Sequence, residues 1–92
     1  MKLEDAQNFV GEAVKISFTF DSNMPVNSYA LVESVTKESI KLRLVYDLET
    51  SIIYDDSVIE PEDSEKLFSN VKIRKLLDTE KYQWMDSVSN VH

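Results

Sequence analysis

The sequence of 92 residues contains no cysteine, one glycine and one histidine. The absence of cysteine excludes a disulfide framework and thiol chemistry, and a single histidine leaves zinc without a ligand set. Gly11 stands in none of the glycine-containing motifs of phosphate-binding, dinucleotide-binding or EF-hand loops. His92 is the last residue, so we expect no catalysis that depends on histidine. These absences predict a protein that is not an enzyme and that uses no cofactor and no metal.

Long apolar runs are also missing. No apolar stretch reaches the roughly 18 residues of a membrane span. The sequence turns acidic at Glu4 and Asp5 with no apolar run behind them, so we expect no signal peptide. No Asn-x-Ser/Thr sequence occurs either. A chain of this length can bury one modest core, and we therefore expect a single domain over residues 1–92 of a soluble, cytoplasmic protein.

Basic residues are few, since ten lysines and arginines stand against seventeen aspartates and glutamates, for a net charge of −7. Such a chain is repelled by nucleic-acid phosphates and by anionic membranes, so we expect it to bind neither directly. The charge is also uneven along the sequence. Residues 44–65 contain eight acids and no base, whereas residues 66–81 contain five bases and two acids.

Three segments carry the pattern of β-strands. Apolar and polar residues alternate strictly over residues 13–20 and again over 39–46, which indicates strands with one buried face. In the second of these runs the predicted buried face includes Leu44. Residues 28–36 lie between them and are rich in β-branched residues, but Glu33 falls on the apolar side. A β-bulge near Glu33 and Ser34 would restore the pattern and bend the strand.

Shorter elements flank this meander. We predict a helix over Leu3–Val10, ended by Gly11, and a helical turn starting at Pro61. A fourth strand is expected over Thr50–Tyr54, with a break at Asp55 and Asp56 and a brief extension at residues 57–59.

After this region, a fifth strand is expected over Val71–Leu77. Residues 78–80 then resemble a hairpin turn into Lys81–Met85, where Tyr82 and Trp84 alternate with Lys81, Gln83 and Met85 and would face the core. The alternative for these two aromatic residues is an exposed anchor for a partner. A helix starting at Thr79 is the competing interpretation, because the residues after it tolerate one.

A short N-terminal helix followed by a bent meander with a bulged second strand resembles the architecture of small SH3-like and Sm-like barrels, over about residues 3–60. The loop glycines of the Sm family are absent, so no functional residue is carried over from it. We therefore predict a mainly β fold, a small α+β domain, consisting of a bent five- to six-stranded antiparallel barrel with a short N-terminal helix.

The acidic segment and the aromatic residues beside it form the candidate binding site. Carboxylates along a loop and an edge strand can steer a basic partner, while apolar side chains anchor it. The predicted partner-binding residues are Asp47, Glu49, Asp55, Asp56, Glu60, Glu62, Asp63 and Glu65, with Tyr46 and Tyr54 as anchors. Compact acidic chains without cysteine are typical of immunity proteins and of phage-encoded inhibitors of host defence. The sequence therefore predicts an inhibitor or sequestering partner of a basic, nucleic-acid-processing protein, and the alternative for this segment is a solvated loop that only confers solubility.

Other functions stay open. A barrel with exposed edge strands could pair with copies of itself as an assembly subunit. Lys72, Arg74 and Lys75 could bind a small phosphorylated ligand at an oligomer interface, or pair with the acidic segment. Asp55, Asp56, Glu60 and Asp63 could offer hard oxygen ligands to a divalent cation. Asp55, Asp56 and Glu60 could also support catalysis by carboxylates alone.

Overall fold

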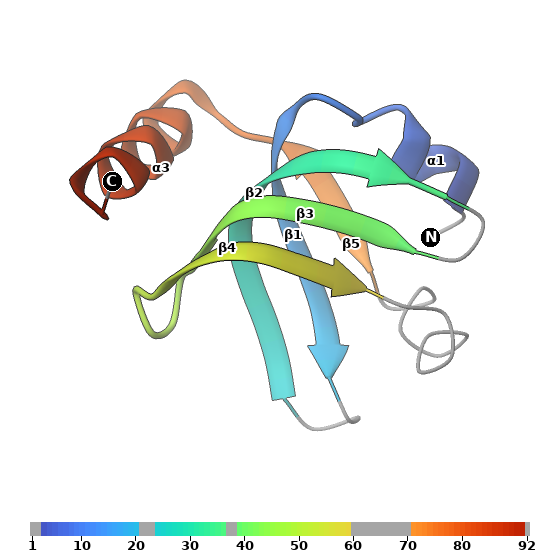
Figure 1. Ribbon diagram of the computed structural model, residues 1–92, viewed down its shortest axis with the longest axis horizontal. Coiled ribbons are helices and arrows are strands. Elements are labelled where there is room, and N and C mark those ends of the chain that lie inside the picture. Colours follow the sequence, from blue (N-terminus) through green and yellow to red (C-terminus); the bar gives the residue numbers. More distant parts are fainter. Residues whose placement is uncertain (1–2, 21–23, 37–38, 60–70, 92) are drawn as a thin grey trace.

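The computed structural model describes residues 3–20, 24–36, 39–59 and 71–91. In chain order the elements are α1 (Leu3–Gln7), β1 (Ala13–Phe20), β2 (Met24–Val35), β3 (Ile40–Asp47), β4 (Ile53–Ile59), β5 (Lys72–Lys75) and α3 (Asp78–Val91). The five strands form one open antiparallel sheet in the order β4-β3-β2-β1-β5 (Figure 1). The mainly β fold predicted from the sequence is confirmed.

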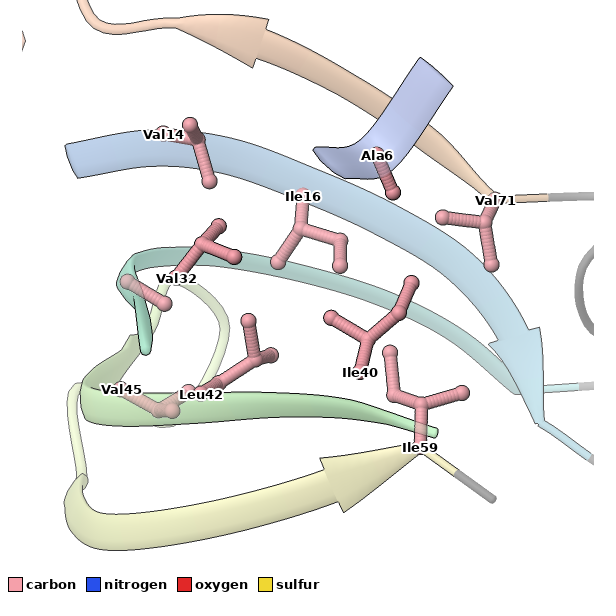
Figure 2. Close-up of a cluster of buried hydrophobic side chains, with 10 residues drawn as sticks. Ala6, Val14, Ile16, Val32, Ile40, Leu42, Val45, Ile59 and Val71 are labelled. Atoms are coloured by element: carbon pink, nitrogen blue, oxygen red, sulfur yellow. The ribbon is translucent and has the colours of Figure 1, made fainter. Parts of the chain in front are cut away.

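The hydrophobic core lies between the two halves of the bent sheet, where β1 and β2 face β3 and β4 (Figure 2). β1 and β2 each contribute core residues of one parity, as the period-two pattern requires, whereas the buried parity of β3 changes after Leu42. The buried side chains are Val14, Ile16, Ala30, Val32, Ile40, Leu42, Val45 and Ile59, together with Ala6 of α1 and Val71 just before β5. This shared core fixes the positions of the strands, and the strands in turn position the partner-binding surfaces described below.

The first helix is shorter than predicted. α1 ends at Gln7, and the chain continues in tighter turns in which the N–H of Phe9 donates to the carbonyl of Ala6 at 3.0 Å. Gly11 has a φ of +84°, a left-handed conformation that costs glycine little, so its predicted role in ending the helical segment is confirmed. The helical turn expected at Pro61 lies outside the described residues.

The bulge predicted in the second strand is confirmed. Val32 pairs with Leu42 and Ser34 pairs with Lys41, so Glu33 is an extra residue on β2. The bulge places the Glu33 side chain on the exposed side, where its carboxylate lies 3.4 Å from the Lys41 ammonium and 3.7 Å from the Arg43 guanidinium. A buried charge is thereby avoided.

The uninterrupted alternation predicted for the third strand is wrong. Tyr29 pairs with Tyr46 whereas Leu31 pairs with Arg43, so β3 contains one residue more than β2 between these pairs. Leu44 has a φ of +52°, and this left-handed residue shifts the buried parity so that Val45, not Leu44, enters the core. A non-glycine residue in this conformation costs about 1–2 kcal/mol, which the surrounding contacts must offset.

The break predicted at Asp55 and Asp56 is also wrong, because β4 runs without interruption from Ile53 to Ile59. Cross-strand charge explains how the strand tolerates these residues. Asp56 is directly opposite Arg43 of β3, and such pairs of opposite charge stabilise a ladder.

The hairpin predicted near the C-terminus is wrong as well, since residues 78–91 form the helix α3. Glu80 favours its start, because the Oε1 atom accepts the backbone N–H of Leu77 at 2.9 Å and the carboxylate lies in the first turn. On a helix, Tyr82 and Trp84 point in different directions, so Trp84 is buried and Tyr82 is exposed. Among the described residues, no helix has the length and apolar character needed to cross a bilayer.

Candidate partner-binding surfaces

The predicted acidic site is described only in part. Four of its acids, Glu60, Glu62, Asp63 and Glu65, lie outside the described residues. The other six members belong to the β3–β4 hairpin: Tyr46 and Asp47 at the end of β3, Glu49 in the turn, and Tyr54, Asp55 and Asp56 in β4. The hairpin therefore brings these six residues into one part of the molecule, although not onto one face.

Asp47 and Tyr46 make contacts that shape the hairpin. The Oδ1 atom of Asp47 accepts the backbone N–H groups of Glu49 at 2.9 Å and Thr50 at 3.4 Å, so this carboxylate shapes the turn. Tyr46 stacks on Tyr29 with ring centroids 6.3 Å apart and an angle of 22° between the rings. Contacts within the fold therefore explain the positions of the Asp47 and Tyr46 side chains.

β4 offers the more open part of the hairpin. It pairs with β3 alone among the described strands and so stands at one end of the sheet. Tyr54 and Val58 are exposed to 46% and 47%, and Ile52, just before the strand, is exposed as well. We call the exposed residues Glu49, Ile52, Tyr54, Asp55, Asp56 and Val58 the β4 surface. The sequence prediction missed Ile52 and Val58, although Val58 has the parity of Tyr54.

The molecule's own bases offset part of this acidity. Arg43 lies 3.9 Å from Asp56 and 3.7 Å from Glu33, and the side chains of Arg43 and Asp56 are both more than half exposed. Exposed pairs at such distances contribute little, and Asp56 remains accessible to a stronger cationic partner. The described residues include no group of three or more side chains that could hold a metal ion.

The basic strand β5 is occupied mainly by internal contacts. The Arg74 guanidinium binds both oxygens of Glu80, at 2.6 and 2.7 Å, and Lys75 lies 3.4 Å from Glu12. Because Arg74 and the Leu77 N–H both bind the Glu80 carboxylate, its pKa falls from 4.5 to about 2. The hydroxyl of Tyr29 donates to the same carboxylate at 3.2 Å, and burial followed by the charge of Glu80 raises the pKa of Tyr29. This cluster fixes the first turn of α3 to the sheet.

A second contact fixes the middle of α3. The indole Nε1–H of Trp84 donates to the carbonyl oxygen of Leu44 at 2.9 Å. Leu44 is the left-handed residue of β3, so the strained bulge supplies the acceptor that holds the helix. The inner side of α3 is therefore attached to both β3 and β5.

Among the described residues, the opposite side of α3 forms no hydrogen bond or ion pair with the sheet. Tyr82 is 77% exposed and Met85 is 51% exposed, and the exposed carboxylates Asp78 and Asp86 lie one turn before and one turn after Tyr82. We call these four residues the outer face of α3. The sequence analysis gave Tyr82 as an exposed anchor only as an alternative and missed Asp78, Met85 and Asp86, because only a helix places residues four apart side by side. The spacing of these residues was the available signal.

A small pocket of about 260 Å³ lies beside the start of α3. Its walls are Gly11, Glu12, Ala13, Lys75, Leu76 and Lys81. The volume is below the roughly 300–1,000 Å³ of typical ligand pockets. Glu12 and Lys75 form an ion pair, so among the described lining residues Lys81 is the one with an uncompensated ammonium.

Comparison with protein-family models, with curated proteins and with solved structures finds no match for this chain.

Proposed function

We propose that this chain is a non-catalytic binding module that takes a basic protein partner onto its β4 surface. One observation carries the proposal: an end strand of the sheet exposes Tyr54 and Val58 by nearly half beside Asp55 and Asp56. Natural proteins usually cover or charge such an edge, because it templates pairing with another chain. Here the charge has one dominant sign, which selects a partner of the opposite sign.

The proposed mechanism separates encounter from anchoring. The net charge of −7 and the carboxylates of the hairpin speed the approach of a basic surface. An extended segment of the partner then adds to the edge of β4 that no described strand covers, through main-chain hydrogen bonds. Tyr54 and Val58 provide the apolar contacts that slow dissociation.

The partner class follows from charge. Proteins that process nucleic acids carry basic surfaces for phosphate, and a compact acidic chain can occupy such a surface in its place. The proposed role is therefore that of a cytoplasmic inhibitor or sequestering partner, of the immunity-protein or phage anti-defence kind. The strand order and the bulged β2 support the assignment of the sheet to the SH3-like or Sm-like barrels.

The test is a matched pair of charge reversals. The partner is captured from a lysate of the native host on the immobilised chain, identified, and measured by association kinetics at several salt concentrations. Asp55→Lys should slow association by about 3–10-fold at ~20 mM salt and have little effect above ~0.3 M. Asp5→Lys changes the same charge on the exposed surface of α1 and serves as the control. Equal association rates for the two variants at low salt would refute the proposal.

A second candidate function is self-assembly. Both β4 and β5 end the open sheet, and β5 carries Lys72, Arg74 and Lys75, so the acidic edge of one copy could pair with the basic edge of the next. Sedimentation separates the two functions, because a monomer at tens of micromolar contradicts assembly. A small phosphorylated ligand has weaker support, since Arg74 and Lys75 already contact Glu80 and Glu12.

A further inference from the structure

We propose that the outer face of α3 is a second contact surface for the basic partner, on which Tyr82 receives an arginine side chain between Asp78 and Asp86. The proposal rests on the proposed function only for the positive charge of the partner. It uses residues that the β4 surface does not contain.

The exposure of Tyr82 is the first step of the argument. Tyr82 is 77% exposed on a helix that already buries Trp84 on the other side, so folding does not require an aromatic residue there. Met85 follows at i+3 and is also half exposed, which makes a continuous apolar strip. Tyrosine and methionine are enriched in protein interfaces, and aspartate in general is depleted, so the flanking acids need a separate reason.

Charge complementarity supplies that reason. Asp78 and Asp86 are exposed, and within the described part of the chain neither forms an ion pair. An arginine guanidinium can lie flat on a tyrosine ring and donate in-plane hydrogen bonds to a carboxylate beside it. Lys81 lies at the flank of Tyr82 and would repel a cation there, so the approach is from the side of Asp86.

The helix is held firmly enough to present this face. Glu80 binds Arg74 through both oxygens, and Trp84 binds the carbonyl of the strained Leu44. Backbone strain persists only where surrounding contacts require it and is a pointer to function. A fixed helix loses little further freedom on binding, which favours affinity.

The probe for the test is a fluorescein-labelled nona-arginine peptide, titrated by fluorescence anisotropy at about 0.15 M ionic strength, where charges more than ~8 Å away are largely screened. Tyr82→Leu should weaken binding by about two- to fivefold, and Tyr82→Phe, which keeps the ring, should not. Asp86→Asn should also weaken binding by about two- to fivefold, with Asp5→Asn as the charge-matched control on α1. Figure 1 shows α1 and α3 on opposite sides of the molecule. Nona-lysine should bind more weakly than nona-arginine.

Each outcome decides the proposal. If Tyr82→Leu and Asp86→Asn bind like Asp5→Asn while Asp55→Asn binds more weakly, this inference is wrong and the proposed function stands. If no variant differs from Asp5→Asn, both are wrong. Sedimentation of the same proteins tests whether a second copy of the chain occupies this face instead. If Tyr82→Leu turns a dimer into a monomer, a second copy covers the face and the inference fails. The helical circular-dichroism signal confirms that each variant keeps α3.

Discussion

Replacement of Glu80 tests how α3 is held. In Glu80→Gln the side chain keeps its shape but loses the charge that binds Arg74 at 2.6 and 2.7 Å. A pKa lowered from 4.5 to about 2 corresponds to about 3 kcal/mol as an upper limit. The Glu80 side chain is only 14% exposed but that of Arg74 is 47% exposed, and water screens the pair. We therefore expect a loss of about 1–2 kcal/mol at pH 7, or about 5–12 °C in Tm.

The contribution of Glu80 to stability should depend on pH. Folding lowers the pKa of Glu80, so its contribution is fully present above pH 4.5 and is lost as the pH falls through about 2. The difference in Tm between the wild type and Glu80→Gln should shrink steadily between pH 4.5 and pH 2. A constant difference over that range would show that the charge is not the cause.

The assay uses the only tryptophan of the sequence, Trp84, which lies in α3. Thermal unfolding is followed by tryptophan fluorescence for the helix and by far-ultraviolet circular dichroism for the whole domain. Glu49→Gln makes the same chemical change on an exposed turn residue and should leave Tm within about 1 °C. Equal Tm values for Glu80→Gln and Glu49→Gln at pH 7 would refute the role of the Glu80 carboxylate in holding α3.

Three further changes test other parts of the fold. Gly11→Ala forces a side chain into a φ of +84° where no atom lies within 4 Å of the new Cβ, so it should cost about 1–2 kcal/mol in urea unfolding; a neutral result would contradict the left-handed helix end. Trp84→Phe removes the donor to Leu44 and part of a buried ring, and we expect a loss of about 1–3 kcal/mol and weaker protection of the α3 amides in hydrogen exchange. Unchanged exchange would contradict this contact. Ser51→Asn places a residue tolerant of left-handed geometry at a φ of +58° and should raise stability by about 0.5 kcal/mol in the same urea assay; a decrease would contradict the turn geometry.

The two bulges differ in how visible they are in the sequence. Glu33 is charged but falls at a position where the alternation of the second strand predicts a buried residue. This conflict indicated a bulge in the sequence, and β2 is bulged there. Leu44 is apolar and fits either parity, so the alternation of the third strand concealed the bulge at that residue. A shift of parity shows in a sequence only when it would bury a polar residue.

The C-terminal helix depended on contacts that no local pattern contains. Its residues tolerate both structures, and α3 is favoured by Glu80 with Arg74 and Tyr29, and by Trp84 with Leu44. Two of these partners are 40 and 51 residues away along the chain. Tertiary contacts thus override a weak local preference.

The candidate site was predictable in its charge but not in its geometry. The absence of bases over residues 44–65 is plain in the sequence. Which carboxylates remain accessible depends on register, because Arg43 is opposite Asp56 only after the strands pair. The outer face of α3 could not be predicted as a unit, because it exists only once tertiary contacts favour the helix over a hairpin.

The two ends of the sheet also bear on how copies of the chain behave when crowded. β5 is four residues long and three of them are bases, so it offers few ladder bonds to a neighbour. In a fibril, identical β4 segments would stack about 4.8 Å apart and align Asp55 and Asp56 into columns of like charge. Amyloid-like stacking of identical β4 segments is therefore opposed by electrostatic repulsion, and concentrated solutions should stay free of thioflavin-positive fibres at neutral pH.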